Sequence, residues 1–132
     1  MKKTHPKISV IIEKTGTGFS AYAEDHPVYS TGKTMTELIE NVYEAVALYY
    51  EDSKIQMKPD NIKFELDFKQ FFKSYKVLNS KGLAKKIHMN HTLLSQYIQG
   101  HKKPSPTQAG KIMSGIHRIG KELSDMNLIY HR

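Results

Sequence analysis

The sequence of 132 residues contains no cysteine, no apolar run of membrane-spanning length and few acidic residues in its second half. Without cysteine there is no disulfide, no thiolate nucleophile and no zinc site with cysteine ligands, as is usual in a reducing compartment. The amino-terminal MKKTHPK is not followed by the apolar segment of a secretory signal. We therefore expect a cytoplasmic protein that has no membrane partner.

The acidic residues are unevenly distributed along the chain. Residues 1–66 contain 8 Lys and 10 Asp or Glu, a net charge of −2, whereas residues 67–132 contain 10 Lys and 2 Arg against 3 Asp or Glu, a net charge of +9. A dense cluster of cations gains free energy by releasing the counterions condensed on nucleic acid. The change of net charge from negative to positive predicts two domains, 1–66 and 67–132, of which the second binds a polyanion. A solvated basic surface without a partner is the alternative.

Alternating and β-branched segments predict a small sheet in the first domain. A β-branched run at 8–12, a TGTG turn at 15–18 and the alternating segment 19–23 predict a hairpin, and a short extended piece follows around 28–30. Apolar and charged side chains also alternate over residues 62–66, which predicts a strand that returns to the sheet.

One helix is expected between the third and the last of these strands. Thr34 is placed to cap it, Glu37 stands at the capping-box position, and apolar residues recur at helical spacing until the helix ends near Tyr50. The first domain is therefore expected to be β-β-β-α-β, a sheet covered by one helix. The fold class of the whole chain is expected to be α+β.

The stretch from Asn79 to Ser105 has the layout of a helix-turn-helix. Asn79 and Asn90 are good N-caps for two short helices, and Gly100 is a typical helix end. In such a motif the second helix enters the DNA major groove, and the basic loop after it is suited to phosphates.

Further helices are expected on both sides of this motif. Asp67 is placed to cap the first, with Gln70 at its capping-box position. The last begins between Pro104 and Pro106, and its apolar stripe runs to Met126. A helix of about 20 residues is longer than so small a domain needs, so we expect its last two turns to pack on another subunit.

This second domain resembles the Cro/repressor-type (XRE-like) helix-turn-helix. The shared features are helix caps, core positions, a glycine and the exit loop: Asn79, Leu83, Ala84, Met89, Asn90, Leu94, Ser95, Tyr97, Gly100, Pro104 and Ser105. The resemblance implies an all-α domain that binds double-stranded operator DNA, as a homodimer or a higher homo-oligomer.

The same resemblance identifies candidate DNA contacts. The groove-facing positions are His91, Thr92, Ser95 and Gln96. Gln is the natural bidentate partner of adenine, whereas His and Thr contact base edges or a thymine methyl. The candidate phosphate contacts are Ser80, Lys85, Lys86, Lys102 and Lys103. The alternative is that these are exposed residues without a role in binding.

Residues 8–66 resemble the HicB antitoxin domain, a partial ribonuclease-H-like fold. The shared features are the hairpin ending in FSAYAEDHP, Gly32 with Thr34, and the helix TMTELIENVYEAV. In that family such a domain covers the active site of a small HicA ribonuclease, and an attached DNA-binding domain represses the shared operon. The resemblance implies a non-catalytic antitoxin without cofactors that binds a small basic HicA-like toxin, with Glu24 and Asp25 as candidate toxin contacts.

Other functions stay open from the sequence. The first domain is alternatively a ligand-sensing or dimerisation module of a stand-alone transcriptional regulator. An RNA-processing nuclease is suggested by scattered carboxylates, Glu13, Glu24, Asp25 and Glu65, but two-metal chemistry needs them to converge. A metal site is suggested by His88, His91 and His101, which no acidic residue joins at a ligand spacing. We therefore expect neither a metal nor an enzyme.

Overall fold

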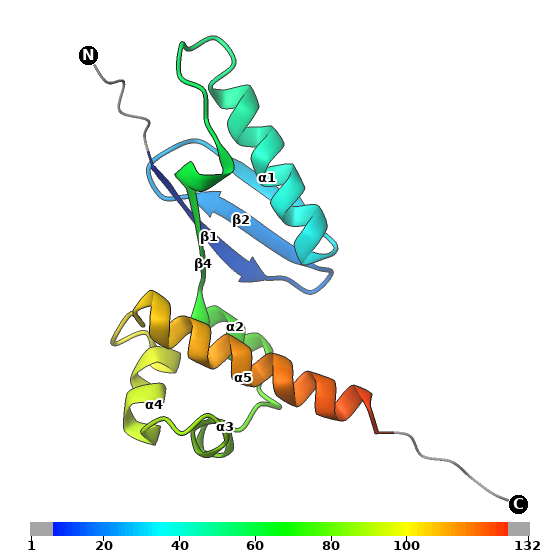
Figure 1. Cartoon of the computed structure of the whole chain (residues 1–132), viewed down its shortest axis with the longest axis vertical. Coiled ribbons are helices and arrows are strands. Elements are labelled where there is room, and N and C mark those ends of the chain that lie inside the picture. Colours follow the sequence, from blue (N-terminus) through cyan, green and yellow to red (C-terminus); the bar gives the residue numbers. More distant parts are fainter. Residues whose placement is uncertain (1–6, 127–132) are drawn as a thin grey trace, which may run out of the picture. The chain divides into compact units, whose positions relative to one another are not determined.

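The computed structural model describes residues 7–126 and divides the chain into two compact units (Figure 1). Unit 1 ends at Ser74 and unit 2 begins at Tyr75. Unit 1 is a mixed sheet with helices, whereas the secondary structure described in unit 2 is helical. The fold class is therefore α+β, as expected. No helix within residues 7–126 has the length and apolar content needed to span a bilayer.

Unit 1 begins with three strands and a helix and returns to the sheet with a fourth strand. Its elements are β1 (Ile8–Lys14), β2 (Phe19–Ala23), β3 (Tyr29–Gly32), α1 (Met35–Tyr49), a short 3-10 helix (Pro59–Asn61), β4 (Ile62–Leu66) and α2 (Phe68–Ser74). The strand order in the sheet is β3-β2-β1-β4; β4 runs parallel to β1, whereas β1 with β2 and β2 with β3 are antiparallel. Since a parallel pair needs a long crossover, α1 supplies the connection to β4. The expected β-β-β-α-β order is confirmed.

One face of this sheet packs on α1 and forms the core of unit 1 (Figure 1). The buried residues alternate along the strands and recur at helical spacing in α1: Ile8, Val10, Ile12, Ala21, Ala23, Val28, Leu38, Val42, Val46 and Ile62. Burial of each Val, Leu or Ile side chain stabilises the fold by about 1.5–3 kcal/mol. Phe64 of β4 meets Tyr43 of α1 edge to face, with ring centroids 5.9 Å apart.

The cap of α1 is close to the expected capping box but differs in one bond. The Thr34 hydroxyl accepts a hydrogen bond from the Glu37 N–H at 3.1 Å, as predicted. The Glu37 carboxylate accepts from the N–H of Lys33 at 3.4 Å, one residue before the cap. Both side chains therefore still serve unpaired donors at the start of the helix.

The helix α2 belongs to unit 1, although the sequence places it in the second domain. The Asp67 N–H donates to the Ile12 carbonyl at 2.9 Å, and the Asp67 carboxylate caps α2 by accepting from the Gln70 N–H at 3.0 Å. The Gln70 side chain does not return to the cap, as a capping box requires. It pairs with the backbone of Lys14, accepting from its N–H at 2.7 Å and donating to its carbonyl. These hydrogen bonds hold α2 at the end of β1, so the boundary between the two units lies after α2, at Ser74.

The described part of unit 2 contains three helices, which start where the sequence predicts, and the predicted caps Asn79 and Asn90 are confirmed. They are α3 (Ser80–Lys86), α4 (His91–Gln99) and α5 (Pro106–Ser124). The side chains of Asn79, Asn90 and Ser105 accept hydrogen bonds from the first turns of these helices at 3.0, 3.2 and 3.2 Å. Gly100 ends α4 in the left-handed conformation, with φ of 80°, where glycine has no steric cost.

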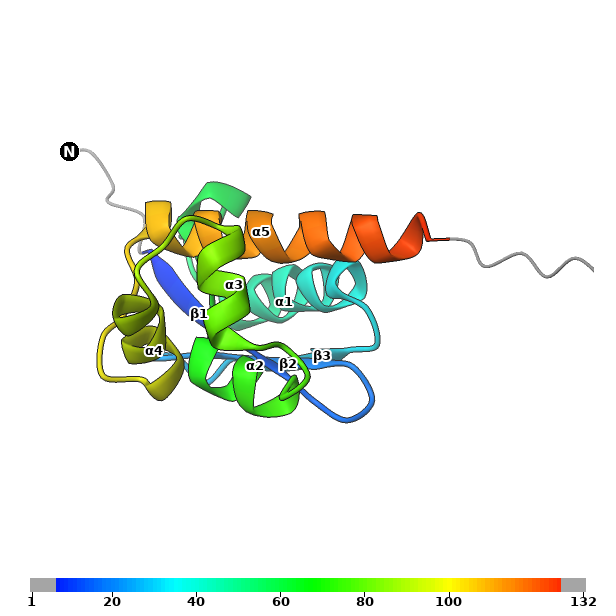
Figure 2. The ribbon, with the colours of Figure 1, turned by 90° about the horizontal axis from the view of Figure 1, so that it is seen from below.

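The core of unit 2 lies where these three helices meet. Its buried residues are Leu83, Ala84, Ile87, Met89, Leu94, Tyr97, Ile112 and Gly115. Tyr97 is buried in α4, whereas the apolar side chain of Ile98 is only half-buried. The second half of α5 extends past α3 and α4 (Figure 2), and Leu123 and Met126 near its end are 63% and 74% exposed.

Candidate nucleic-acid interface

The amino-terminal half of α4 presents a polar face. His91 and Thr92 are exposed, and Ser95 and Gln96 are half-buried. Since residues four apart are neighbours on a helix, His91 lies beside Ser95 and Thr92 beside Gln96. The buried Leu94 anchors α4 in the core of unit 2. The structure therefore brings the four candidate base contacts onto one helix face.

The starts of α3 and α4 lie close together. The Ser80 hydroxyl oxygen is 3.5 Å from Nε2 of His91, although the two residues are eleven positions apart. Ser80 is a candidate phosphate contact and His91 a candidate base contact. Their proximity would allow one stretch of DNA to meet both, with the phosphate beside the base edge.

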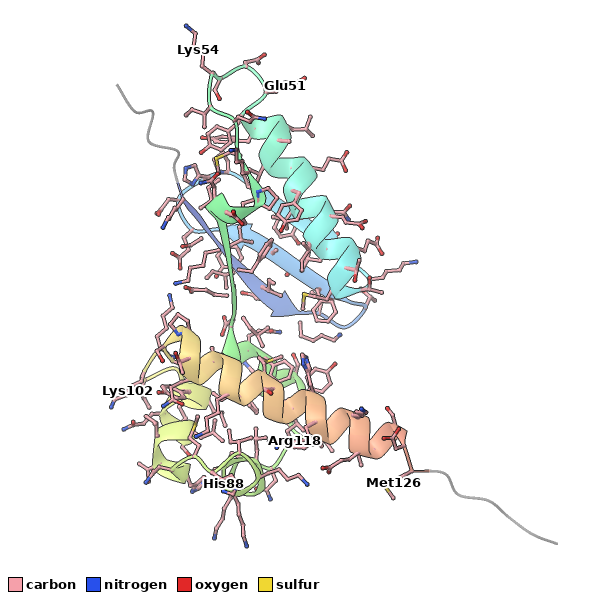
Figure 3. The ribbon with its side chains drawn as sticks, in the orientation of Figure 1. Glu51, Lys54, His88, Lys102, Arg118 and Met126 are labelled. Atoms are coloured by element: carbon pink, nitrogen blue, oxygen red, sulfur yellow. The ribbon has the colours of Figure 1, made fainter. Side chains whose placement is uncertain are left out.

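The loop after α4 is fixed to the end of that helix. The Gln96 carbonyl accepts hydrogen bonds from the N–H groups of His101 and Lys102, at 2.9 and 3.2 Å. The Gly100 N–H also donates to this carbonyl, and these bonds together close the end of α4. They also hold the exposed pair Lys102 and Lys103 next to the polar face, and Figure 3 shows Lys102 projecting from this loop.

The two lysines at the end of α3 have different surroundings. Both Lys85 and Lys86 are exposed, but Lys86 pairs with Glu122 of α5, with 2.9 Å between Nζ and Oε2. The two side chains are 44% and 54% exposed, and an exposed pair of this kind contributes only about 0–1 kcal/mol. A phosphate would therefore compete with Glu122 for Lys86 at little cost.

The turn between α3 and α4 has a conformation that the sequence did not predict. His88 has φ of 56°, in the left-handed region, which is uncommon for any residue other than glycine. Its carbonyl accepts a hydrogen bond from Nζ of Lys111 at 3.2 Å. Lys111 is thus placed at the turn by α5, and no local pattern could identify it. Among residues 7–126, no three His, Asp or Glu side chains converge as a possible metal site.

The excess of basic residues lies in unit 2 when the charges are counted from the observed boundary between Ser74 and Tyr75. Residues 75–132 contain 8 Lys and 2 Arg against 2 Asp or Glu, a net charge of +8, and residues 1–74 contain 10 Lys against 11 Asp or Glu, a net charge of −1. The polar face of α4 therefore lies in the strongly cationic unit.

No family model, curated protein or solved structure matches this chain. The candidate interface is therefore described by the chemistry and positions of its own residues.

The candidate toxin contacts lie in unit 1. Glu24 and Asp25 are exposed side by side in the loop between β2 and β3. The pKa of the Tyr22 phenol is raised by partial burial and by three nearby carboxylates, those of Glu13, Asp67 and Glu24. Glu24 thus belongs to a local group of acidic side chains around Tyr22, which sequence spacing alone does not reveal.

Proposed function

We propose that this chain is an antitoxin of the HicB type that regulates its own operon. Unit 2 binds operator DNA through α4, and unit 1 binds and neutralises a small ribonuclease toxin, without catalysis by this chain. The observation that carries the proposal is the single face of α4 on which His91, Thr92, Ser95 and Gln96 lie, in a unit of net charge +8.

The DNA-binding half of the proposal divides the work between two kinds of contact. The Gln96 amide has the donor and acceptor that an adenine edge matches, and His91 and Thr92 add contacts to neighbouring bases. Lys102 and Lys103, held next to this face by the Gln96 carbonyl, bind phosphates and supply affinity that does not depend on base sequence.

The toxin-binding half rests on the resemblance of residues 8–66 to HicB domains. The β-β-β-α-β unit supports it, as do the exposed Glu24 and Asp25, which offer a basic toxin a complementary charge. Exposed Leu123 and Met126 at the end of α5 support pairing with a second copy, which a two-fold symmetric operator requires.

One experiment tests both halves. The full chain is titrated, at a stated salt concentration, with the DNA upstream of its own gene and with random DNA of equal length. It is also purified from its native cell and examined for a small ribonuclease that it inhibits. Preference for the upstream DNA together with inhibition of a co-purifying ribonuclease is the expected result. Equal affinity for both DNAs contradicts the repressor role. DNA preference without a ribonuclease partner favours a stand-alone regulator with a ligand-sensing or dimerisation module.

A further inference from the structure

The sheet of unit 1 has a second face, away from α1, that carries two exposed tyrosines. Tyr22 lies between the buried Ala21 and Ala23 on β2, so its side chain points away from α1. Tyr29 on the edge strand β3 is its partner in the antiparallel register. The two side chains are 38% and 66% exposed. An aromatic pair is thus presented side by side to solvent on two paired strands.

The same cross-strand row continues over the rest of the sheet. Ile11 of β1 is the partner of Tyr22, and Glu65 of β4 is the partner of Ile11. Ile11 is half-buried, and Glu65 is paired with Lys63 at 3.1 Å. The row therefore changes from aromatic to aliphatic to acidic across four strands.

Carboxylates lie close to Tyr22 in this row. Glu13 lies two residues after Ile11 on the same side of β1, and Glu24 follows β2 directly. Both are close enough to Tyr22 to raise the pKa of its phenol, after the larger effect of partial burial. We call Tyr22, Tyr29, Ile11, Glu13 and Glu24 the tyrosine surface.

We propose that the tyrosine surface is where a small basic protein docks on unit 1. The inference rests on the proposed function, because the toxin is that basic protein. Tyrosine is enriched at the centres of protein interfaces, where its ring buries much apolar area and its hydroxyl still forms a hydrogen bond. Flanking carboxylates steer a cationic partner toward these rings, whereas they repel nucleic acid and anionic lipid.

The test measures the affinity of the full chain for one defined probe, the small protein encoded beside its gene and produced together with it. Replacing both Tyr22 and Tyr29 by Thr, which keeps β propensity, is expected to weaken binding at least about 30-fold, the loss typical of one interface hot spot. Replacing both by Phe keeps the rings and is expected to retain most of the affinity. The matched control is Leu48→Ala, which removes a 62% exposed apolar side chain from α1 and leaves affinity unchanged.

The second part of the experiment tests the role of charge with variants of exposed or half-exposed carboxylates, whose replacement does not disturb the core. Glu13→Gln with Glu24→Gln is expected to slow association about tenfold and to reduce its salt dependence, whereas Glu40→Gln with Glu44→Gln on exposed positions of α1 leaves both unchanged. Glu24→Lys alone gives a larger loss than Glu24→Gln because it repels the probe.

The outcomes separate this inference from the proposed function. A wild-type complex that survives the Thr and Glu24→Lys changes, or that is weakened as much by Leu48→Ala, overturns the tyrosine surface and leaves the antitoxin function standing. Failure of the wild-type chain to bind the small protein overturns both.

Discussion

Ile87, the residue that caps the C-terminus of α3, lies against the backbone of Gly115 in α5, so closely that a β-carbon on residue 115 would overlap the isoleucine side chain. Glycine is a poor helix former, and its presence in the middle of α5 costs about 1 kcal/mol relative to alanine. The packing of two helices in unit 2 offsets that cost. This contact links α5 to the end of α3, the first helix of the candidate helix-turn-helix.

Gly115→Ala is therefore expected to destabilise the protein although alanine favours helix. Overpacking of a filled core costs about 1–3 kcal/mol, which exceeds the gain in helix propensity. Gly110→Ala and Gly120→Ala are the matched controls in the same helix, since nothing lies within 4 Å of a β-carbon at either position. Each control should stabilise by about 0.5–1 kcal/mol. Urea unfolding followed by helical circular dichroism measures all three, and equal gains at the three sites would refute the contact.

Replacing His88 by glycine should stabilise the protein, whereas Gly115 should not be replaced by a larger residue. Its φ of 56° is strained for a side-chain-bearing residue, by about 1–2 kcal/mol, and glycine removes most of that strain while increasing the entropy of the unfolded chain. The expected result of His88→Gly is a gain of up to about 1 kcal/mol in the free energy of unfolding. His101→Gly, at an exposed loop position with negative φ, should give no gain. A loss of stability in His88→Gly would mean that the turn adopts another conformation.

The Tyr22 phenol should make stability depend on pH in the alkaline range. Its pKa is raised in the folded state, so the unfolded chain loses this proton first as the pH rises. The contribution of Tyr22 is therefore complete below the unfolded pKa of about 10 and is lost as the pH rises through the folded pKa. Tyr22→Phe should flatten the fall in stability above that pH. Glu13→Gln should flatten it partly, and an unchanged slope in both variants contradicts the acidic surroundings of Tyr22.

Local patterns predicted the helix starts of unit 2 because their hydrogen bonds are local. Asn79, Asn90 and Ser105 each bond within their own first turn, so residue type and spacing suffice. The same reasoning failed for Gln70. Gln70 does stand three residues after the cap Asp67, but its side-chain amide pairs with the backbone of Lys14, 56 residues away. Because Lys14 belongs to β1, this pairing places α2 in unit 1 and not in the second domain.

In the candidate site, too, the features that depend on local spacing were predictable from the sequence, and those that depend on tertiary contacts were not. The face of α4 follows from helical spacing alone. The proximity of Ser80 and His91, the pairing of Lys86 with Glu122 and the Tyr22–Tyr29 pair all depend on how separate elements meet. A strand register cannot be read from one strand, because the partner residue lies on another segment of the chain.

Gln96 should contribute to specificity rather than to general affinity. If its amide reads a base edge, Gln96→Ala is expected to cost about 1–3 kcal/mol on the operator and little on random DNA. Gln56→Ala, the same change at an exposed loop position of unit 1, should affect neither. Fluorescence anisotropy with both DNAs at one salt concentration measures the ratio, and equal losses on the two DNAs would place the wrong side of α4 against the duplex.

Lys102 and Lys103 should show the opposite pattern. If both bind phosphates, changing both to Ala weakens binding to operator and random DNA alike. Each lost contact also releases about one counterion fewer, so the slope of log affinity against log salt becomes shallower by roughly two. Lys54→Ala with Lys69→Ala removes the same charge from exposed positions of unit 1 and should leave the slope unchanged. Affinities measured across a salt series decide the matter. An unchanged slope in the Lys102 and Lys103 variant, or an equal change in the control, would mean that net charge and not the loop beside α4 carries the attraction to DNA.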